Sequence, residues 1–231
     1  VENDDGSITW TLDYGEDGCE DYGYWMKGKI IETYIYDENT YSGTIEYINF
    51  GDEYFTQNGT STFSGTWEDN WSEEDSTDYS YSGTYQHSED MEYTYIDEDE
   101  GIEETYSVVA SGKQSYDETG FTVEEEDYTY TAENGDTFSG SVSTPLFYSY
   151  ECETDDNDQW IFVYVSGVEN YTYAESDATG TFSIDYCDGE CDNIITITEN
   201  GETYEIDLGE EWEDDWEDEE DGEEDDGNTE S

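Results

Sequence analysis

Hydrophobic and polar residues alternate along several stretches of this chain, most clearly near its C-terminal end. The apolar positions there share one face of two predicted strands: Ile195, Ile197, Tyr204, Ile206 and Leu208. Thr and acidic residues occupy the positions between them, and a period of two is that of a β-strand. Asn200-Gly201 lies between the two stretches and tolerates the positive φ angles of a type I′ turn. The pattern therefore predicts a β-hairpin.

Two short patterns recur along the chain. The Asn-Gly turn signal returns at Asn134-Gly135 and at Asn58-Gly59, and predicts further turns there. A Ser-Gly or Thr-Gly step also recurs inside predicted strands, at Gly43, Gly65, Gly83, Gly112, Gly140, Gly167 and Gly180. Gly inside a strand marks a bulge, a bend or the close approach of another layer. The steps favour a meander whose strands bend at a similar height.

Tyrosines separated by two positions indicate which face of the sheet is aromatic. They occur as Tyr34 and Tyr36, Tyr93 and Tyr95, Tyr128 and Tyr130, and Tyr171 and Tyr173. Helical periodicity is hard to find before the C-terminal segment. We predict an all-β fold, an antiparallel meander of many short strands that forms either an extended sheet or a sandwich. The body spans residues 1–208, as one unit or as two related units of about 1–120 and 121–208, and an acidic tail follows over 209–231.

The charge balance first suggests a disordered chain. There are 68 Asp and Glu residues against 3 Lys and Arg, a formal net charge of −65. However, 17% of the residues are aromatic and only one is Pro, which is unlike disordered acidic chains. The tail holds 15 of the acids, so 53 belong to the predicted sheet. These carboxylates repel one another, and we expect salt or Ca²⁺ to stabilise the fold.

The same composition excludes several functions. Phosphate-mediated binding to nucleic acid and docking on an anionic membrane both need clustered Lys and Arg, which the chain lacks. No apolar run is long enough for a transmembrane helix. Residues 1–5 do not have the pattern of a signal peptide, so we expect any such segment to have been removed. The single histidine, His87, is interpreted as an incidental surface residue, and we expect no enzyme activity.

Acidic loops are the candidate sites for cations. Ca²⁺ prefers carboxylate and carbonyl oxygens in turning loops. The candidate ligands are Asp185, Asp188, Glu190 and Asp192, together with Asp13 and Asp17. No loop has the EF-hand pattern, and a diffuse cation atmosphere is the alternative. We expect no other cofactor.

The chain has four cysteines: Cys19, Cys152, Cys187 and Cys191. The even number and the acidic, exported character favour disulfides. Cys187 and Cys191 are close enough to form a bridge across a loop, which leaves Cys19 with Cys152. Four cysteines allow three pairings, and the sequence does not choose among them. Zinc fits poorly, because there is no second close cysteine pair.

Several ordered motifs together resemble a known group of proteins. They are Leu12-Asp13-Tyr14-Gly15, Gly18-Cys19, Lys27-Gly28-Lys29-Ile30, Thr144-Pro145-Leu146 with Cys152, and residues 180–186 and 191–193 with 200–206. The chain resembles uncharacterised β-rich, often lipoprotein-like, surface proteins of Bacteroidota over about residues 8–208. The resemblance implies export and a cell-surface or extracellular location. It implies no activity. Asp75-Ser76-Thr77 is also similar to the O-glycosylation acceptor of that phylum, with Ser76 as the acceptor.

Three functions follow from these patterns. The first is a non-enzymatic exported protein of the cell surface or extracellular matrix that acts by self-assembly or adhesion, with cations, further copies or other surface proteins as partners. The strand around residues 8–12 is the candidate edge for such pairing. The second is a surface carbohydrate-binding module, in which Trp67 and Trp71 stack on sugars. The third is an acidic mimic that captures a basic partner.

Overall fold

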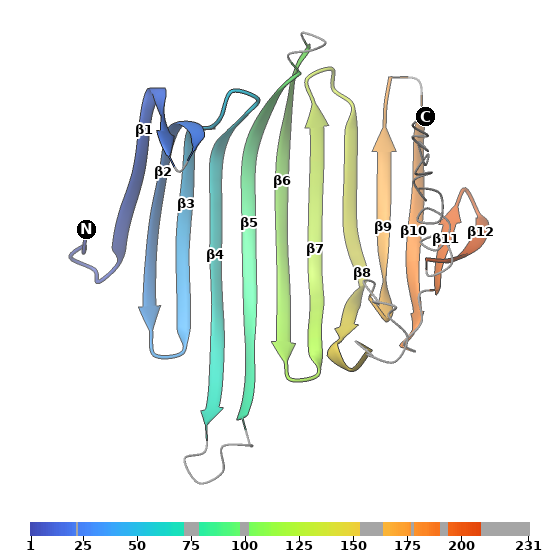
Figure 1. The fold of residues 1–231 in the computed structure, drawn as a ribbon. Helices are drawn as coiled ribbons and strands as arrows, with labels where there is room; N and C mark the ends of the chain where they lie inside the picture. The colour runs from blue at the N-terminus through green and yellow to red at the C-terminus, as the bar shows by residue number, and fades with distance from the viewer. Residues whose placement is uncertain are drawn as a thin grey trace, which may run out of the picture.

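The computed structural model describes residues 1–21, 23–71, 79–97, 102–152, 164–176, 178–189 and 194–208. These residues form one antiparallel sheet of twelve strands, and each strand pairs with its neighbours in sequence (Figure 1). The all-β meander is therefore confirmed. Of the two expected architectures, the chain adopts the extended sheet. With neighbouring strands about 4.8 Å apart, twelve strands span about 53 Å.

The strands are β1 (Ile8–Asp21), β2 (Tyr24–Asp37), β3 (Thr40–Gly51), β4 (Phe55–Trp71), β5 (Tyr79–Asp97), β6 (Ile102–Asp117), β7 (Gly120–Ala132), β8 (Thr137–Ser149), β9 (Ser166–Ala174), β10 (Thr179–Asp188), β11 (Ile194–Glu199) and β12 (Glu202–Asp207). A single turn of 3-10 helix, η1 (Tyr150–Cys152), follows β8.

Two of the three predicted Asn-Gly turns are confirmed. Asn200 and Gly201 have φ angles of 52° and 83° and join β11 to β12. Asn134-Gly135 lies in the connection between β7 and β8. The turn predicted at Asn58-Gly59 is wrong, because β4 runs straight through it.

The local contacts explain why Asn58-Gly59 is extended. The side-chain oxygen of Asn58 accepts a hydrogen bond from the backbone N–H of Asn49, at 2.6 Å, where β3 bulges against β4. A Cβ atom on Gly59 would lie 2.2 Å from the carbonyl oxygen of Asp90 on β5. Asn58 therefore stabilises the bulge in β3, and Gly59 allows β4 and β5 to approach closely.

Pairing in register gives the sheet two different faces. The aromatic face carries Tyr34, Phe63, Tyr93, Tyr106, Tyr128, Phe138, Tyr171 and Phe182. Its rings contact one another from strand to strand. The Tyr171 and Phe182 ring centroids lie 4.6 Å apart, and those of Tyr93 and Tyr106 lie 5.3 Å apart. The opposite face, here called the hydroxyl face, carries mainly Ser, Thr and acidic residues.

The repeated Gly steps are explained by these rings. Five glycines face an aromatic partner on the next strand: Gly43 with Phe63, Gly65 with Tyr41, Gly83 with Tyr116, Gly140 with Tyr128, and Gly180 with Tyr173. A Cβ atom on Gly140 would lie 2.4 Å from Cζ of Tyr128. The ring thus occupies the space that a side chain would fill. The group that approaches these glycines is a ring on the neighbouring strand of the same sheet, and not the second layer that the sequence suggested.

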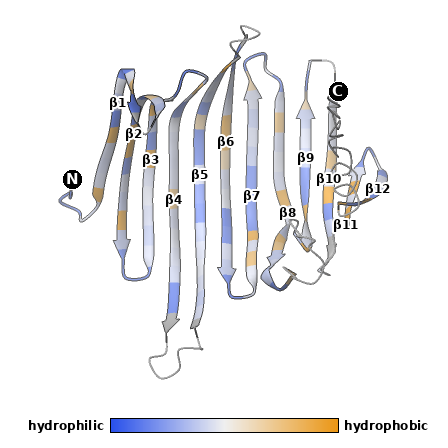
Figure 2. Ribbon diagram, in the orientation of Figure 1, coloured by the Kyte–Doolittle hydropathy of each residue, from blue (hydrophilic) through white to orange (hydrophobic). Residues whose placement is uncertain are grey.

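A single layer buries few side chains completely. The buried apolar residues of the described chain are Met91, Val108, Val123, Leu146, Cys152, Val165 and Ile195. Figure 2 shows apolar residues as short bands on many strands, without a continuous apolar layer. Cross-strand contacts between half-buried rings therefore take the place of a two-layer core.

Candidate functional site

One row of the hydroxyl face crosses all twelve strands in unbroken register. Ten of its twelve residues carry a hydroxyl group, and the row runs Thr9, Thr33, Thr44, Thr62, Ser88, Ser111, Asp127, Ser141, Asn170, Ser183, Thr198 and Thr203. Neighbouring hydroxyls pair at both ends, with 2.9 Å between Oγ1 of Thr9 and of Thr33. Sequence reasoning missed this row, because it depends on the register of every strand pair.

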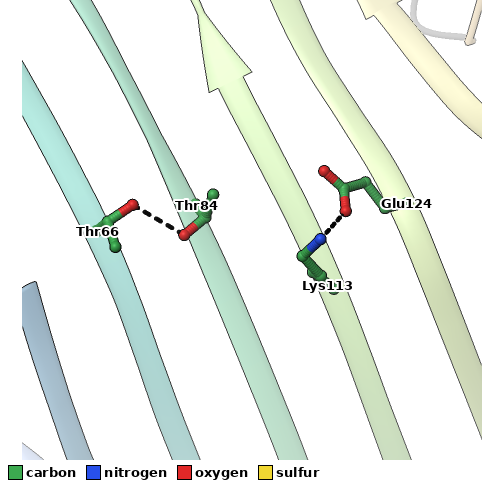
Figure 3. A network of polar contacts seen from close by, with 4 residues as sticks. All are labelled: Thr66, Thr84, Lys113 and Glu124. Carbon is green, nitrogen blue, oxygen red and sulfur yellow. Dashed lines mark hydrogen bonds and ion pairs between the residues drawn. The ribbon is translucent and has the colours of Figure 1, made fainter.

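An open trough of about 640 Å³ lies along this row, over the middle strands. Small polar side chains line it, among them those of Ser42, Ser64 and Gln86, which make no side-chain hydrogen bond to another residue of the described chain. Lys113 lies at one side, and its ammonium group pairs with the Glu124 carboxylate (Figure 3). This hydrogen bond raises the pKa of Lys113 and lowers that of Glu124. The trough therefore offers unused hydroxyl and amide groups.

A second polar contact in Figure 3 joins β4 and β5 beside the trough. The hydroxyl oxygens of Thr66 and Thr84 lie 3.0 Å apart. Both residues line a further trough of about 400 Å³ with Ser115 and Thr122. Small hydroxyl residues thus extend the polar surface toward the ends of the strands.

Carboxylates on the aromatic face are held by tyrosines. Oε2 of Glu169 accepts hydrogen bonds from the hydroxyls of Tyr171, at 2.9 Å, and Tyr186, at 2.7 Å. Burial and these hydrogen bonds raise the pKa of both tyrosines. The carboxylate is therefore part of the ring network and contributes to the packing of β9 and β10.

His87 is not the incidental surface residue that the sequence suggested. Its side chain is only 13% exposed, because its ring stacks on Tyr85 with 5.7 Å between centroids. Its Nε2 lies 3.4 Å from Oε1 of Glu126, and burial raises the pKa of that carboxyl group. The pair is a packed polar contact within the aromatic face.

The edge formed by β1 is partly covered by the N-terminal residues. The Thr9 N–H donates to the carbonyl oxygen of Val1 at 2.7 Å, and the Val1 ammonium group donates to the carbonyl of Thr9. The backbone groups of Thr9 therefore point away from β2. Because these directions alternate along a strand, the backbone groups of Thr11 and Asp13 point outward too. No other strand of the described chain pairs with them.

Three exposed apolar side chains and one ion pair lie near the start of β1. Ile8, Trp10 and Leu12 are 41%, 37% and 40% exposed. Two of the chain's three basic residues, Lys27 and Lys29, lie on β2, where they balance Asp13 and Glu32 over residues 8–15 and 27–36. Nζ of Lys29 lies 2.9 Å from Oδ2 of Asp13, and this bond lowers the pKa of Asp13.

The opposite edge, formed by β12, has a different character. The strand has six residues, and three of them are acidic: Glu202, Glu205 and Asp207. The turn before it pairs Glu199 with Glu202, so Glu202, Tyr204 and Ile206 direct their backbone groups toward β11. Thr203 and Glu205 therefore direct theirs outward. The two edge strands thus differ in length, and β12 has the higher share of acidic residues.

The two sets of predicted calcium ligands do not come together. Asp13 and Asp17 lie on β1 and Asp185 lies on β10, which is nine strand spacings or about 43 Å away. The Asp188 side chain, Glu190 and Asp192 lie outside the described residues. Where the structure describes side chains, no three His, Cys, Asp or Glu residues form a metal-binding group.

The cysteines do not pair as the sequence suggested. Cys19 is a free, exposed thiol, so its predicted disulfide is wrong. Cys19 is on β1 and Cys152 follows β8, about 33 Å across the sheet, whereas a disulfide needs Cα atoms within about 7 Å. Cys152 is buried and disulfide-bonded. Its partner lies outside the described side chains, and so do the side chains of Cys187 and Cys191.

The predicted glycan platform is only partly described. Trp67 lies on the aromatic face, where its ring stacks on Tyr41 with 5.9 Å between centroids and contacts Tyr36 edge-on at 6.2 Å. The indole is therefore one member of the ring network. The Trp71 side chain and Ser76 lie outside the described residues.

Comparison with known proteins finds no matching family model, curated protein or solved structure. Within the described chain, no helix has the length and apolar character needed to cross a membrane.

Proposed function

We propose that this chain is a non-enzymatic, exported protein of the cell surface or extracellular matrix that assembles through the open edges of its sheet. The observation that carries the proposal is the β1 edge. It offers outward backbone groups at Thr11 and Asp13 beside exposed Trp10 and Leu12. An exposed apolar edge strand is a template for pairing with another chain.

Cations are the expected partners of this assembly. A formal net charge of −65 makes two copies repel each other. Repulsion between exposed charges falls as salt shortens the screening length, to about 8 Å at physiological ionic strength. Monovalent salt would act by screening alone, whereas Ca²⁺ would also bind carboxylates. Assembly should therefore respond to Ca²⁺ at concentrations too low for general screening.

The test is the mass of the full chain in solution. Light scattering after size exclusion, and negative-stain microscopy, would be performed with millimolar CaCl₂ and with EDTA at equal ionic strength. We expect oligomers or polymers with Ca²⁺ and their loss with EDTA. Leu12→Glu should prevent assembly, whereas Ile35→Glu, an equally exposed apolar position on β2, should not. A monomer under all conditions would reject the proposal.

The trough on the hydroxyl face supports a second candidate function, the binding of carbohydrate. Its unpaired hydroxyl and amide groups can exchange hydrogen bonds with sugar hydroxyls. A glycan array followed by titration calorimetry would test this. Loss of binding in Ser42→Val/Ser64→Val would place the sugar in the trough, whereas loss in Trp67→Ala would place it on the aromatic face. Absence of glycan binding by the native chain would reject this candidate.

A further inference from the structure

We infer that the partner of the β1 edge is β12 of a second copy, so that the chains add head to tail into an open ribbon. The inference rests on the proposed function and names its partner and geometry. It follows from strand direction, backbone groups, strand length and charge.

Strand direction permits this joint without turning either molecule over. Neighbouring strands run antiparallel and there are twelve of them, so β1 and β12 run in opposite directions. A second copy shifted sideways in the same orientation therefore places its β1 antiparallel to β12 of the first copy. Such a head-to-tail contact leaves one free edge at each end, and further copies can add.

The outward backbone groups at the two edges also match. Thr11 and Asp13 present theirs on β1, and Thr203 and Glu205 present theirs on β12. The side chains of all four lie on the hydroxyl face. Two residues that exchange backbone hydrogen bonds in an antiparallel pair direct their side chains to the same side. The joint therefore continues both the hydroxyl and the aromatic face.

Strand length favours β12 over a second β1. The free part of the β1 edge begins after Thr9, whose outward groups already bond Val1, and its register shifts after Asp13 and again after Gly15. Four residues of β12, Thr203–Ile206, fit beside the free stretch Trp10–Asp13, and only the last residue of the strand, Asp207, then lies next to Thr9. A symmetric β1–β1 pair centred on Leu12 would place Gly15 of one copy where Val1 lies in the other.

Charge also favours a joint between β1 and β12 over a joint between two β12 strands. The β11–β12 hairpin carries four acidic residues and no base: Glu199, Glu202, Glu205 and Asp207. Two β12 edges would bring these carboxylates together. The stretch of β1 that would lie beside β12, residues 9–14, has one acid, Asp13, and its carboxylate already pairs with Lys29. A mixed joint therefore has the least repulsion of the joints that involve β12.

The test uses two variants that each block one edge. Thr11→Pro removes an outward N–H of β1, and Glu205→Pro removes one of β12, and Pro is tolerated where an edge N–H faces outward. We expect each variant alone to stay monomeric in Ca²⁺. An equimolar mixture should form a dimer, in which β12 of the Thr11→Pro chain joins β1 of the Glu205→Pro chain. This dimer should not grow, because both of its outer edges carry the blocking proline. Thr11→Ser and Glu205→Gln, which keep the N–H, should assemble like the native chain.

Each other outcome is informative. Dimers of Glu205→Pro alone would overturn the inference in favour of a β1–β1 contact. A monomeric mixture, with native chain that still assembles, would reject both edges as partners. Native chain that never assembles would instead reject the proposed function itself. If circular dichroism shows that a proline variant is unfolded, Thr11→Glu or Thr203→Glu replaces it in the same mixing experiment.

Discussion

The packing of an aromatic ring over a strand glycine can be tested at Gly140 and Tyr128. These residues face each other on β8 and β7, and a Cβ atom on Gly140 would lie within 2.4–2.7 Å of three atoms of the Tyr128 side chain. Gly140→Ala should therefore force the ring away from the sheet. Gly140 has no positive φ, so the backbone itself accepts Ala.

Two opposing contributions set the expected magnitude. Overpacking of this kind costs about 1–3 kcal/mol. Replacing Gly by Ala restricts the unfolded chain and offsets about 0.4–1 kcal/mol. We expect Gly140→Ala to lower the free energy of unfolding by about 1–2 kcal/mol. For a chain of this size, each kcal/mol corresponds to a Tm decrease of about 2–4 °C.

A double-mutant cycle isolates the contact. With Tyr128→Ala the space above Gly140 is empty, so adding Gly140→Ala should be neutral or stabilise by up to about 1 kcal/mol. Urea unfolding followed by far-ultraviolet circular dichroism gives the four free energies. An equal effect of Gly140→Ala with and without the Tyr128 ring would refute the reasoning.

Three further predictions follow from charge and thiol chemistry. Millimolar Ca²⁺ or added salt should raise the Tm of the native chain by reducing carboxylate repulsion, and an unchanged Tm would contradict this. Burial raises the pKa of Glu126 in the folded chain, so its contribution to stability is present below pH 4 and is lost as pH rises. Glu126→Gln should therefore be more stable than the native chain at pH 7 and not at pH 3.5, whereas exposed Glu125→Gln should show no such difference. Cys19 should react with a thiol reagent in the folded chain, and Cys19→Ser should lower the number of reactive thiols by one, whereas Cys152→Ser should not lower it.

The strand order and the last hairpin were accessible from sequence because their signals are local. Asn200-Gly201 defines its own turn, and alternation on both sides defines the register. The longest strands gave a weaker signal. In β5, Glu89 and Asp90 are adjacent acids in the middle of a 19-residue strand, and their environment comes from β4 and β6 rather than from alternation along β5.

The candidate edges and the hydroxyl row were harder to predict. The residues that form a row across the sheet depend on bulges, which shift the pairing of neighbouring strands. One bulge lies at Gly28, where a Cβ atom would lie 2.1 Å from the carbonyl oxygen of Asn49. The ion pair beside the β1 edge forms because Asp13 and Lys29, sixteen positions apart, become cross-strand partners. Cys19 shows the same limit, since an even cysteine count indicates nothing about distance across a sheet.

The strictly sequential strand order has a consequence for folding. Each strand contacts mainly the strands before and after it in the chain, so almost every contact between strands joins two consecutive strands. Such a molecule behaves as a one-dimensional array of nearest-neighbour units, in which order can begin at any hairpin and spread in both directions. Unfolding should correspondingly begin at the outer hairpins, and a weakened central strand should divide the sheet into two cooperative halves.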